Sequence, residues 1–385
     1  MRTAFEILFW LSGGLILWTQ LGYALALAAI ARLRRPAAGV SVAGEPGQTP
    51  TLSLIVAAHD EEAVIAAKVS NALALDYPRE RLELIVACDG CSDATAARAR
   101  EAGADLVLEL PRGGKIRAQD AAVESSRGEL LGFSDANSVW EPGAARTLVG
   151  AFADASVGYA CGQVRFVQAV AGAGGGNQEG VYWRYEMALR ALESCLSSIT
   201  AGNGAIYATR RSSYLVVDPV MGHDLSLPFN MVKRGLRAVY VPEARASEKM
   251  VPSIAGEFAR KRRMMSHTWP ILLRGGMLSP RGYPPGYAAM IVSHRLLRYS
   301  SPGLHLLALA SNLALLATGA GALYGVTLAL QLALLAAAAL AGRVPLRPLL
   351  IARYYVLTTA SPAAGLWDWL RAGTDATWDA AEGTR

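Results

Sequence analysis

Two long segments without a charged side chain dominate this sequence of 385 residues, one near each end. Residues 7–31 contain no Asp, Glu, Lys or Arg, and residues 299–342 contain none either. About 20 apolar residues in a helix cross a bilayer, so the first segment is long enough for one span and the second for two. The sequence therefore predicts a transmembrane anchor in residues 1–35 and a transmembrane hairpin in residues 301–342.

A third apolar run, residues 354–367, is shorter and contains Pro362 and Gly365. Runs of this length are more often interfacial or re-entrant than spanning. We therefore expect residues 343–385 to form a membrane-associated C-terminal segment. The composition, with 52% hydrophobic and 18% charged residues, agrees with a membrane protein that also has a soluble part.

The arginines beside these segments predict which side of the membrane each part occupies. They cluster after the first segment and on both sides of the hairpin, at Arg32, Arg34, Arg35, Arg295, Arg298, Arg343 and Arg347. Because cytoplasmic loops carry an excess of Lys and Arg, the N-terminus is expected outside and residues 36–300 in the cytosol of a multi-pass inner (cytoplasmic) membrane protein. A signal peptide cleaved near Ala28 is the alternative, but the apolar run is too long for a typical one.

The positive charge of the chain is concentrated in residues 256–300, which hold eight Lys or Arg and one acidic residue, Glu257. Beside membrane spans, such a segment predicts basic interfacial helices. Their partners would be anionic headgroups or phosphates, and no nucleic acid partner is expected.

The region 50–255 alternates apolar runs with helical patterns. Strands are predicted at 52–58, 82–87, 105–110 and 130–134, each followed by a helix, and Asp60 is placed to cap the first helix. This alternation predicts a doubly wound α/β sheet, in which ligands bind outside the carboxyl ends of the strands. A polar side chain follows each predicted strand: Glu61, Asp89, Lys115, and Asp135 with Asn137.

The pair Asp135 and Asn137 is the strongest metal candidate among these. Residues two apart on a strand point to the same face, so both side chains can reach one ion. Carboxylate and amide oxygens suit Mg²⁺ or Mn²⁺, which takes its other ligands from water and a substrate phosphate. The alternative is an ordinary strand-to-helix turn, where Asp and Asn are common.

The motif Cys88-Asp89-Gly90-Cys91 has the spacing of zinc and redox sites. No second cysteine pair or histidine pair lies at ligand spacing in the sequence. We therefore expect neither a metal nor a redox function for this motif.

Together these motifs resemble glycosyltransferase family 2, in its membrane-bound branch with the cellulose, chitin and hyaluronan synthases. The resemblance covers residues 52–300 in matching order and implies a GT-A fold. It implies that Asp89 contacts the base of a nucleotide, that Glu61 also contacts the nucleotide and that Lys115 lies near the diphosphate. Asp135-Ala136-Asn137 stands where the family has Asp-x-Asp, so one charge of the metal site is lost.

Two further motifs depart from the family pattern. Gly222-His223-Asp224 occupies the place of a Glu-Asp pair, which implies that Asp224 is the catalytic base, although Asp224 could also be a plain helix N-cap. His223, which takes the place of the Glu, could support Asp224 or cap the helix that begins near Leu225. The stretch 260–264 stands where the family has Gln-x-x-Arg-Trp, and Arg263 keeps the arginine of that motif. The resemblance therefore implies that Arg263 contacts the departing diphosphate, with Arg260 beside it at the donor site. The alternative for this basic run is a solvated helix face or a cytosolic membrane anchor.

The resemblance implies an inverting glycosyltransferase that moves a sugar from a nucleotide-sugar, expected to be a UDP-sugar, to a hydroxyl. A membrane lipid or lipid-linked acceptor is the first choice, because Met264 replaces the tryptophan that forms the platform for a sugar chain. The alternatives are a processive polysaccharide synthase and a non-catalytic nucleotide-binding scaffold. An oxidoreductase is disfavoured, because no glycine-rich turn follows the first strand.

Overall fold

The computed structural model describes residues 1–33, 49–167, 176–249 and 253–377. Within these residues, eight strands form one sheet in the order β3-β2-β1-β4-β7-β6-β8-β5. The first four in this order run parallel, and β7 and β5 are antiparallel to their neighbours. The strands are β1 (Leu52–Ala58), β2 (Leu82–Asp89), β3 (Leu106–Leu110), β4 (Leu130–Asp135), β5 (Val139–Trp140), β6 (Val157–Val167), β7 (Tyr207–Arg210) and β8 (Arg237–Lys249).

Helices cover both faces of the sheet, as the continuous apolar character of β1 and β2 requires. One face packs against α3 (Ile65–Leu73), α4 (Thr95–Glu101) and α6 (Ala144–Gly150). The other packs against α5 (Lys115–Ser125), α7 (Gly176–Leu196) and α8 (His223–Lys233). The prediction of a doubly wound α/β sheet is confirmed. The proposed Asp60 cap was wrong, because Val64 is the N-cap residue of α3 and the carboxylate of Asp60 accepts a bond from the backbone N–H of Ser92 at 2.8 Å.

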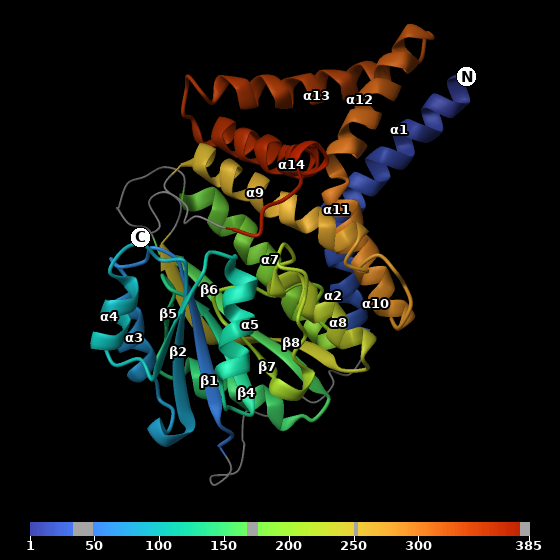
Figure 1. Ribbon diagram of the computed structural model, residues 1–385. Coiled ribbons are helices and arrows are strands. Elements are labelled where there is room, and N and C mark those ends of the chain that lie inside the picture. Colours follow the sequence, from blue (N-terminus) through green and yellow to red (C-terminus); the bar gives the residue numbers. More distant parts are fainter. Residues whose placement is uncertain (34–48, 168–175, 250–252, 378–385) are drawn as a thin grey trace.

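Within the described residues, two helices are long and apolar enough to cross a membrane. The first spans Arg2–Leu33 and comprises α1 (Arg2–Leu17), a π-helical turn (Trp18–Gly22) and α2 (Tyr23–Leu33), and the second is α13 (Ala322–Leu340). A third crossing is possible if α12 (Ser301–Ala317) is counted with the segment Pro285–Tyr299, which is bent from it by 63°. Figure 1 shows α1 and α12 side by side, away from the sheet, with α13 leading from the far end of α12. The predicted hairpin therefore contains one helix that could span alone and one, α12, that could span only with its bent extension.

The basic segment forms α9 (Ile254–Leu273), followed by a loop and a short helical stretch made of α10 (Pro285–Met290), a π-helical turn (Ile291–Leu296) and α11 (Leu297–Tyr299). Figure 1 places α9 between the sheet domain and the apolar helices. A separate apolar cluster joins α2, α7, α8, α9 and α10 through Tyr23, Leu189, Phe229, Trp269 and Tyr287. The sheet domain is thus packed directly against the N-terminal apolar helix.

The third apolar run lies inside α14 (Arg347–Ala372), which packs along α9 (Figure 1). A Cβ atom on Gly365 would lie 2.5 Å from the Cβ of Met265, so the two helices approach too closely for any larger residue there. Trp269 donates to the carbonyl of Pro362 at 2.8 Å. The Pro and Gly of this run therefore mark a helix–helix contact.

Candidate active site

The polar residues predicted at the strand ends do meet at one edge of the sheet. In the register of the parallel strands, Ala57 of β1 is opposite Asp135 of β4, and Ala58 is opposite Cys88 of β2. Strands β2 and β3 lie on one side of β1 and β4 lies on the other, so the order of the strands changes direction between β1 and β4. Open α/β sheets bind ligands at such a point. The candidate site therefore lies at this switch point.

Lys115 and Asp135 form an ion pair at the centre of the site. Gly114 precedes the lysine with a φ of 99°, a conformation that favours glycine, and this turn directs Lys115 toward β4. Burial alone would lower the pKa of Lys115, but the charge and hydrogen bond of Asp135 outweigh it together with the charges of Asp224 and Glu248, and the pKa is raised. A Cβ atom on Gly204 would lie 3.2 Å from Nζ of Lys115 and 3.5 Å from Oδ2 of Asp135, so the 202–204 loop closes one side of the pair.

Asp89 lies at the end of β2 and is almost completely buried. Its carboxylate accepts bonds from the backbone N–H groups of Gly113 at 2.6 Å and of Gly114 at 3.0 and 3.1 Å. Asp89 thus holds the turn that presents Lys115, a role that the sequence did not suggest. The buried Glu61 lies in the turn after β1, where its backbone N–H donates to Thr95 at 2.8 Å. The nucleotide contacts of Asp89 and Glu61 stay predictions.

Asp224 lies in the first turn of α8, whose N-cap residue is Gly222. Its backbone carbonyl accepts a bond from the N–H of Gly202 at 2.7 Å, which ties α8 to the 202–204 loop. The negative charge of Asp224 also contributes to the raised pKa of Lys115, after the effects of burial and of Asp135. The structure therefore brings Asp224, Lys115 and Asp135 into one electrostatic neighbourhood.

His223 does not support Asp224 and does not cap the helix. Its ring is buried and contacts two tyrosine hydroxyls, with Nδ1 at 3.0 Å from Tyr207 and Nε2 at 3.3 Å from Tyr214. Tyr214 donates to Asp120 at 2.5 Å, so its oxygen can accept from Nε2–H while Tyr207 donates to Nδ1. Burial, aided by the positive charge of Lys115, lowers the pKa of His223 to about 3. The ring is neutral and structural.

The burial of the neutral His223 ring predicts that the fold loses stability as the pH is lowered. The pKa of His223 rises from about 3 in the folded protein to 6.5 in the unfolded chain, so the unfolded state binds the proton more tightly. The histidine therefore stabilises the fold fully above pH 6.5, and this contribution falls by about 1.4 kcal/mol per pH unit below it. We expect the thermal midpoint of the wild type to drop between about pH 6.5 and pH 5, and that of His223→Gln to drop less. Equal slopes for the two proteins in this window would contradict the assignment.

The arginines of the basic run on α9 lie in two different environments. Arg260 bonds to Glu257 at 2.8 and 2.9 Å and its guanidinium lies 5.8 Å from the ring centre of Phe166. Arg263 and Met264 are exposed to solvent. The structure brings Arg260 into electrostatic reach of the site through Glu248, whereas the diphosphate contact of Arg263 stays a prediction.

Glu248 and Lys68 are two charged residues of the site that the sequence reasoning missed. Val139 of β5 pairs with Ser247 of β8, which sets Glu248 beside the turn that follows Asp135. Burial, together with the negative charge of Asp135, raises the pKa of Glu248 to about 7, and its buried Oε1 atom has no hydrogen-bond partner in the part of the chain that the structure describes. Lys68 donates to the carbonyl of Ser138 at 2.7 Å, and burial lowers its pKa to about 7. The signal that could have found Glu248 is the apolar run 238–241, which predicts one more strand with an acidic residue near its end.

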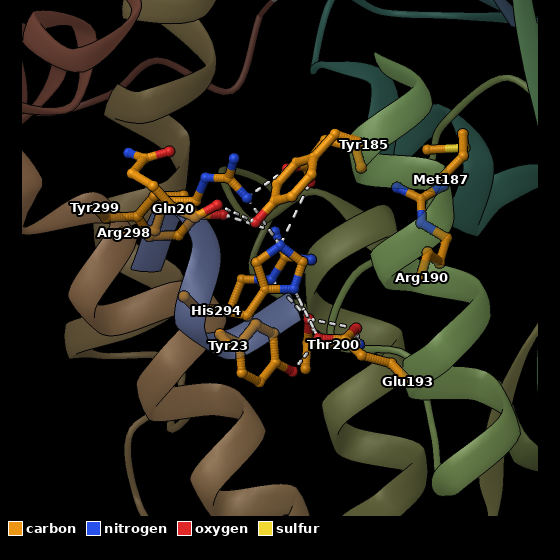
Figure 2. Close-up of polar contacts among 12 residues, drawn as sticks. Gln20, Tyr23, Tyr185, Met187, Arg190, Glu193, Thr200, His294, Arg298 and Tyr299 are labelled. Atoms are coloured by element: carbon orange, nitrogen blue, oxygen red, sulfur yellow. Dashed lines mark hydrogen bonds and ion pairs between the residues drawn. The ribbon is translucent and has the colours of Figure 1, made fainter. Parts of the chain in front are cut away.

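A buried ionic cluster connects the N-terminal apolar helix to the site (Figure 2). Glu193 of α7 accepts bonds from Tyr23 at 2.7 Å, from the backbone N–H of Thr200 at 3.0 Å and from His294 at 2.7 Å. The guanidinium of Arg295 donates to the hydroxyl of Thr200 at 2.8 Å. Although burial opposes ionisation, the positive charges of His294 and Arg295 hold the pKa of Glu193 below its usual range.

The same cluster includes Glu186, which pairs with Arg298 and lies 3.4 Å from the ring of His294. Tyr185 donates to the backbone carbonyl of Gln20 at 2.8 Å, a second link to the apolar helix (Figure 2). Thr200 leads directly into the 202–204 loop, which contacts Asp224. The ionic cluster therefore positions the loop beside the catalytic candidates and fastens it to the N-terminal helix.

Glu193→Gln tests how much this ionic cluster contributes to the stability and the activity of the protein. The variant removes one of the two buried carboxylates that face His294 and Arg295, and breaking such a buried pair costs roughly 3 kcal/mol or more. We expect a clearly lower thermal midpoint in detergent and less activity per folded molecule. Asp76→Asn, which removes a solvent-exposed pair with Arg146, is the matched control and should change stability by less than about 1 kcal/mol. If the Glu193→Gln protein is as stable as this control, the cluster does not stabilise the fold.

An α/β sheet with a lysine, a strand-end aspartate and a helix-borne aspartate at its switch point is the arrangement expected of a nucleotide-sugar transferase of the GT-A class. The family model described as glycosyltransferase like family 2 matches residues 50–266. The chain belongs to this family and is a glycosyltransferase.

Two similar proteins support the family and the fold. The chain is 30% identical over 131 residues to "Probable glycosyltransferase YdaM" of Bacillus subtilis (strain 168), a match that covers 32% of this chain and 31% of that protein. The chain thus spans about a third of the length of that relative. The structure of the mannosyltransferase PcManGT from Pyrobaculum calidifontis, in complex with GDP-Man and Mn²⁺, superposes with a TM-score of 0.69 at 23% identity, covering 96% of this chain and 99% of that one. This likeness covers almost the whole chain, apolar helices included, and confirms the GT-A fold.

Proposed function

We propose that this protein transfers a sugar, with inversion, from a nucleotide-sugar to a hydroxyl of a membrane lipid or lipid-linked acceptor. The observation that carries the proposal is the convergence of Lys115, Asp135, Asp224 and the 202–204 loop at the switch point of the sheet. Asp224 would accept the proton of the acceptor hydroxyl as general base. Lys115, aided by Arg260 and Arg263, would stabilise the negative charge of the departing diphosphate.

A divalent cation, Mg²⁺ or Mn²⁺, fits the same edge of the sheet. Asp135 and Asn137 would supply oxygen ligands from β4 and the turn after it, and Glu248 would add a carboxylate whose buried Oε1 has no hydrogen-bond partner among the described residues. A bound cation would be coordinated by Oε1 of Glu248 and would offset the repulsion between the negative charges of Glu248 and Asp135. When bound, it would neutralise charge on the donor diphosphate. Glu248 would thereby restore the charge that Asn137 lacks.

The location of α9 supports a lipid acceptor. This helix separates the sheet domain from α13 and α14 (Figure 1), so an acceptor that reaches the site along α9 would come from the apolar side of the molecule. The position of the family's platform tryptophan holds Met264, which is 46% exposed and has no aromatic ring to stack on a sugar chain. The proposed topology keeps the sheet domain in the cytosol below an inner membrane. Helix Arg2–Leu33 is one span, and α12 with its bent extension and α13 form a hairpin of two more, which returns α14 to the side of α9.

The test is a donor screen on the purified full chain in detergent with native lipid extract and Mn²⁺. UDP-sugars are the proposed donors, and GDP-sugars belong in the panel because PcManGT was solved with GDP-Man. Release of nucleoside diphosphate, with one sugar added to a lipid by mass spectrometry, is the expected result. A ladder of products would support processive polysaccharide synthesis in place of single addition. No release with any donor would support a non-catalytic scaffold.

A further inference from the structure

The turns after β1 and β2 bring together three side chains that the sequence did not connect. His59 and Asp60 follow β1, and Cys91 follows β2 as the second cysteine of the Cys88–Cys91 motif. One ligand atom from each of the three, a ring nitrogen, a carboxylate oxygen and a sulfur, lies within 4.8 Å of the other two. The sequence shows no further ligand for this motif at the usual spacing. The fold supplies two, His59 and Asp60, from the turn after β1.

The hydrogen bonds around His59 orient it as a metal ligand. Nδ1 lies 2.8 Å from the carbonyl oxygen of Asp89, and because a carbonyl can only accept, Nδ1 carries the proton. The other ring nitrogen, Nε2, lies 3.6 Å from Oδ2 of Asp60 and is the atom that would bind the metal. A backbone carbonyl that orients the ring in this way is the usual support of a metal-bound histidine.

The other two ligands are also held in place. The carboxylate of Asp60 accepts a bond from the backbone N–H of Ser92 at 2.8 Å, and Asp60 has a φ of 49°, the one positive φ of a non-glycine residue in the part of the chain that the structure describes. The thiol of Cys91 lies 3.5 Å from the carbonyl of Ala58, at the end of β1. Cys88 by contrast is buried in the core of the sheet. The three groups therefore form a small open triangle at the edge of the sheet.

We propose that His59, Asp60 and Cys91 bind Zn²⁺, at a site separate from that of Asp135 and Asn137. A thiolate with an imidazole selects zinc over Mg²⁺ or Mn²⁺, which prefer oxygen ligands alone. In a tetrahedral zinc site, ligand atoms lie roughly 3.5 Å apart, so the observed triangle needs side-chain shifts of about 1 Å to close. Three protein ligands leave the fourth position to water. The ion would join the turn that carries Glu61 to the turn that follows Asp89, the two turns predicted to contact the nucleotide.

Cobalt spectroscopy on the full chain tests this site directly, because Co²⁺ substitutes for zinc and reports a bound thiolate. We expect metal-free, reduced protein titrated with Co²⁺ to develop a sulfur-to-cobalt charge-transfer band. The band should be lost in Cys91→Ser. It should remain in Cys195→Ser, which removes an exposed free cysteine elsewhere, and in Asp135→Asn. No band in the wild type, a band that survives Cys91→Ser, or a band lost in Asp135→Asn would each overturn the proposal.

A second measurement guards against variants that fail to fold. Zn²⁺ that binds the folded state raises the thermal midpoint by mass action. We expect this rise in the wild type and in Cys195→Ser, and no rise in His59→Gln or Asp60→Asn. An equal rise in His59→Gln and the wild type would exclude this ligand set. Because both readouts are independent of sugar transfer, they can fail while the proposed glycosyltransferase activity stands, and the reverse also holds.

Discussion

Asp224→Asn should reduce the turnover number by roughly 100-fold to 10,000-fold, the usual contribution of a general base. The amide cannot accept the proton of the acceptor hydroxyl, whereas its size and shape are nearly unchanged. The backbone bond from Gly202 to the carbonyl of residue 224 does not involve the side chain, so the 202–204 loop should keep its position. We therefore expect the loss in kcat, with the donor KM changed much less.

The measurement is steady-state release of nucleoside diphosphate, with the thermal midpoint of each protein as a check on folding. Asp218→Asn is the matched control, because Asp218 is an exposed aspartate in the loop before α8 whose carboxylate accepts a bond from the backbone N–H of Val220. This control should retain turnover within a factor of about two of the wild type. Near-normal turnover of Asp224→Asn would mean that another group removes the proton.

Asp135→Asn should weaken Mn²⁺ binding by at least about 100-fold, because it removes a proposed ligand charge where Asn137 already lacks one. The substitution also leaves Lys115 without its ion-pair partner. We expect donor turnover to fall in parallel and to recover only partly at high Mn²⁺. The affinity is measured on the protein with Mn²⁺ alone by electron paramagnetic resonance, so it does not depend on the donor being known.

Glu248→Gln distinguishes the proposed metal ligand from a buried carboxylate with no role in the site. If Glu248 contributes a ligand oxygen, Mn²⁺ affinity should fall by about 10-fold or more, while Asp218→Asn leaves it unchanged. If Glu248→Gln binds Mn²⁺ with the affinity of the wild type, Glu248 is not a metal ligand. If Asp135→Asn does so, the proposed metal site is wrong.

The local part of this structure was predictable because it depends on residues that are neighbours in the sequence. The uninterrupted apolar runs of β1, β2 and β4 define buried parallel strands, and the polar residue after each one marks the binding edge. The charge-free segments likewise define the helices that are able to cross a membrane. Asp89, Lys115 and Asp135 were found in this way, and the fold brought them together as expected.

The interactions that complete the site join residues far apart in the sequence, which no local pattern records. Tyr23 and Glu193 are separated by 170 positions, and Glu193 and His294 by 101, yet they share one buried ionic cluster. Glu248 entered the site only through the pairing of β5 with β8. The role of His223 was also undecided until Tyr207 and Tyr214 were found on its two ring nitrogens.

The sequence by itself therefore determined the class of fold, the binding edge of the sheet, the family and the apolar helices. Only the tertiary structure decided which polar groups are buried together, because burial and charge pairing depend on the packing of separate elements. That packing made His223 a neutral structural residue and Glu193 an anchor of the site loop. It also placed His59 and Asp60 beside a cysteine motif that had no ligands in its own segment.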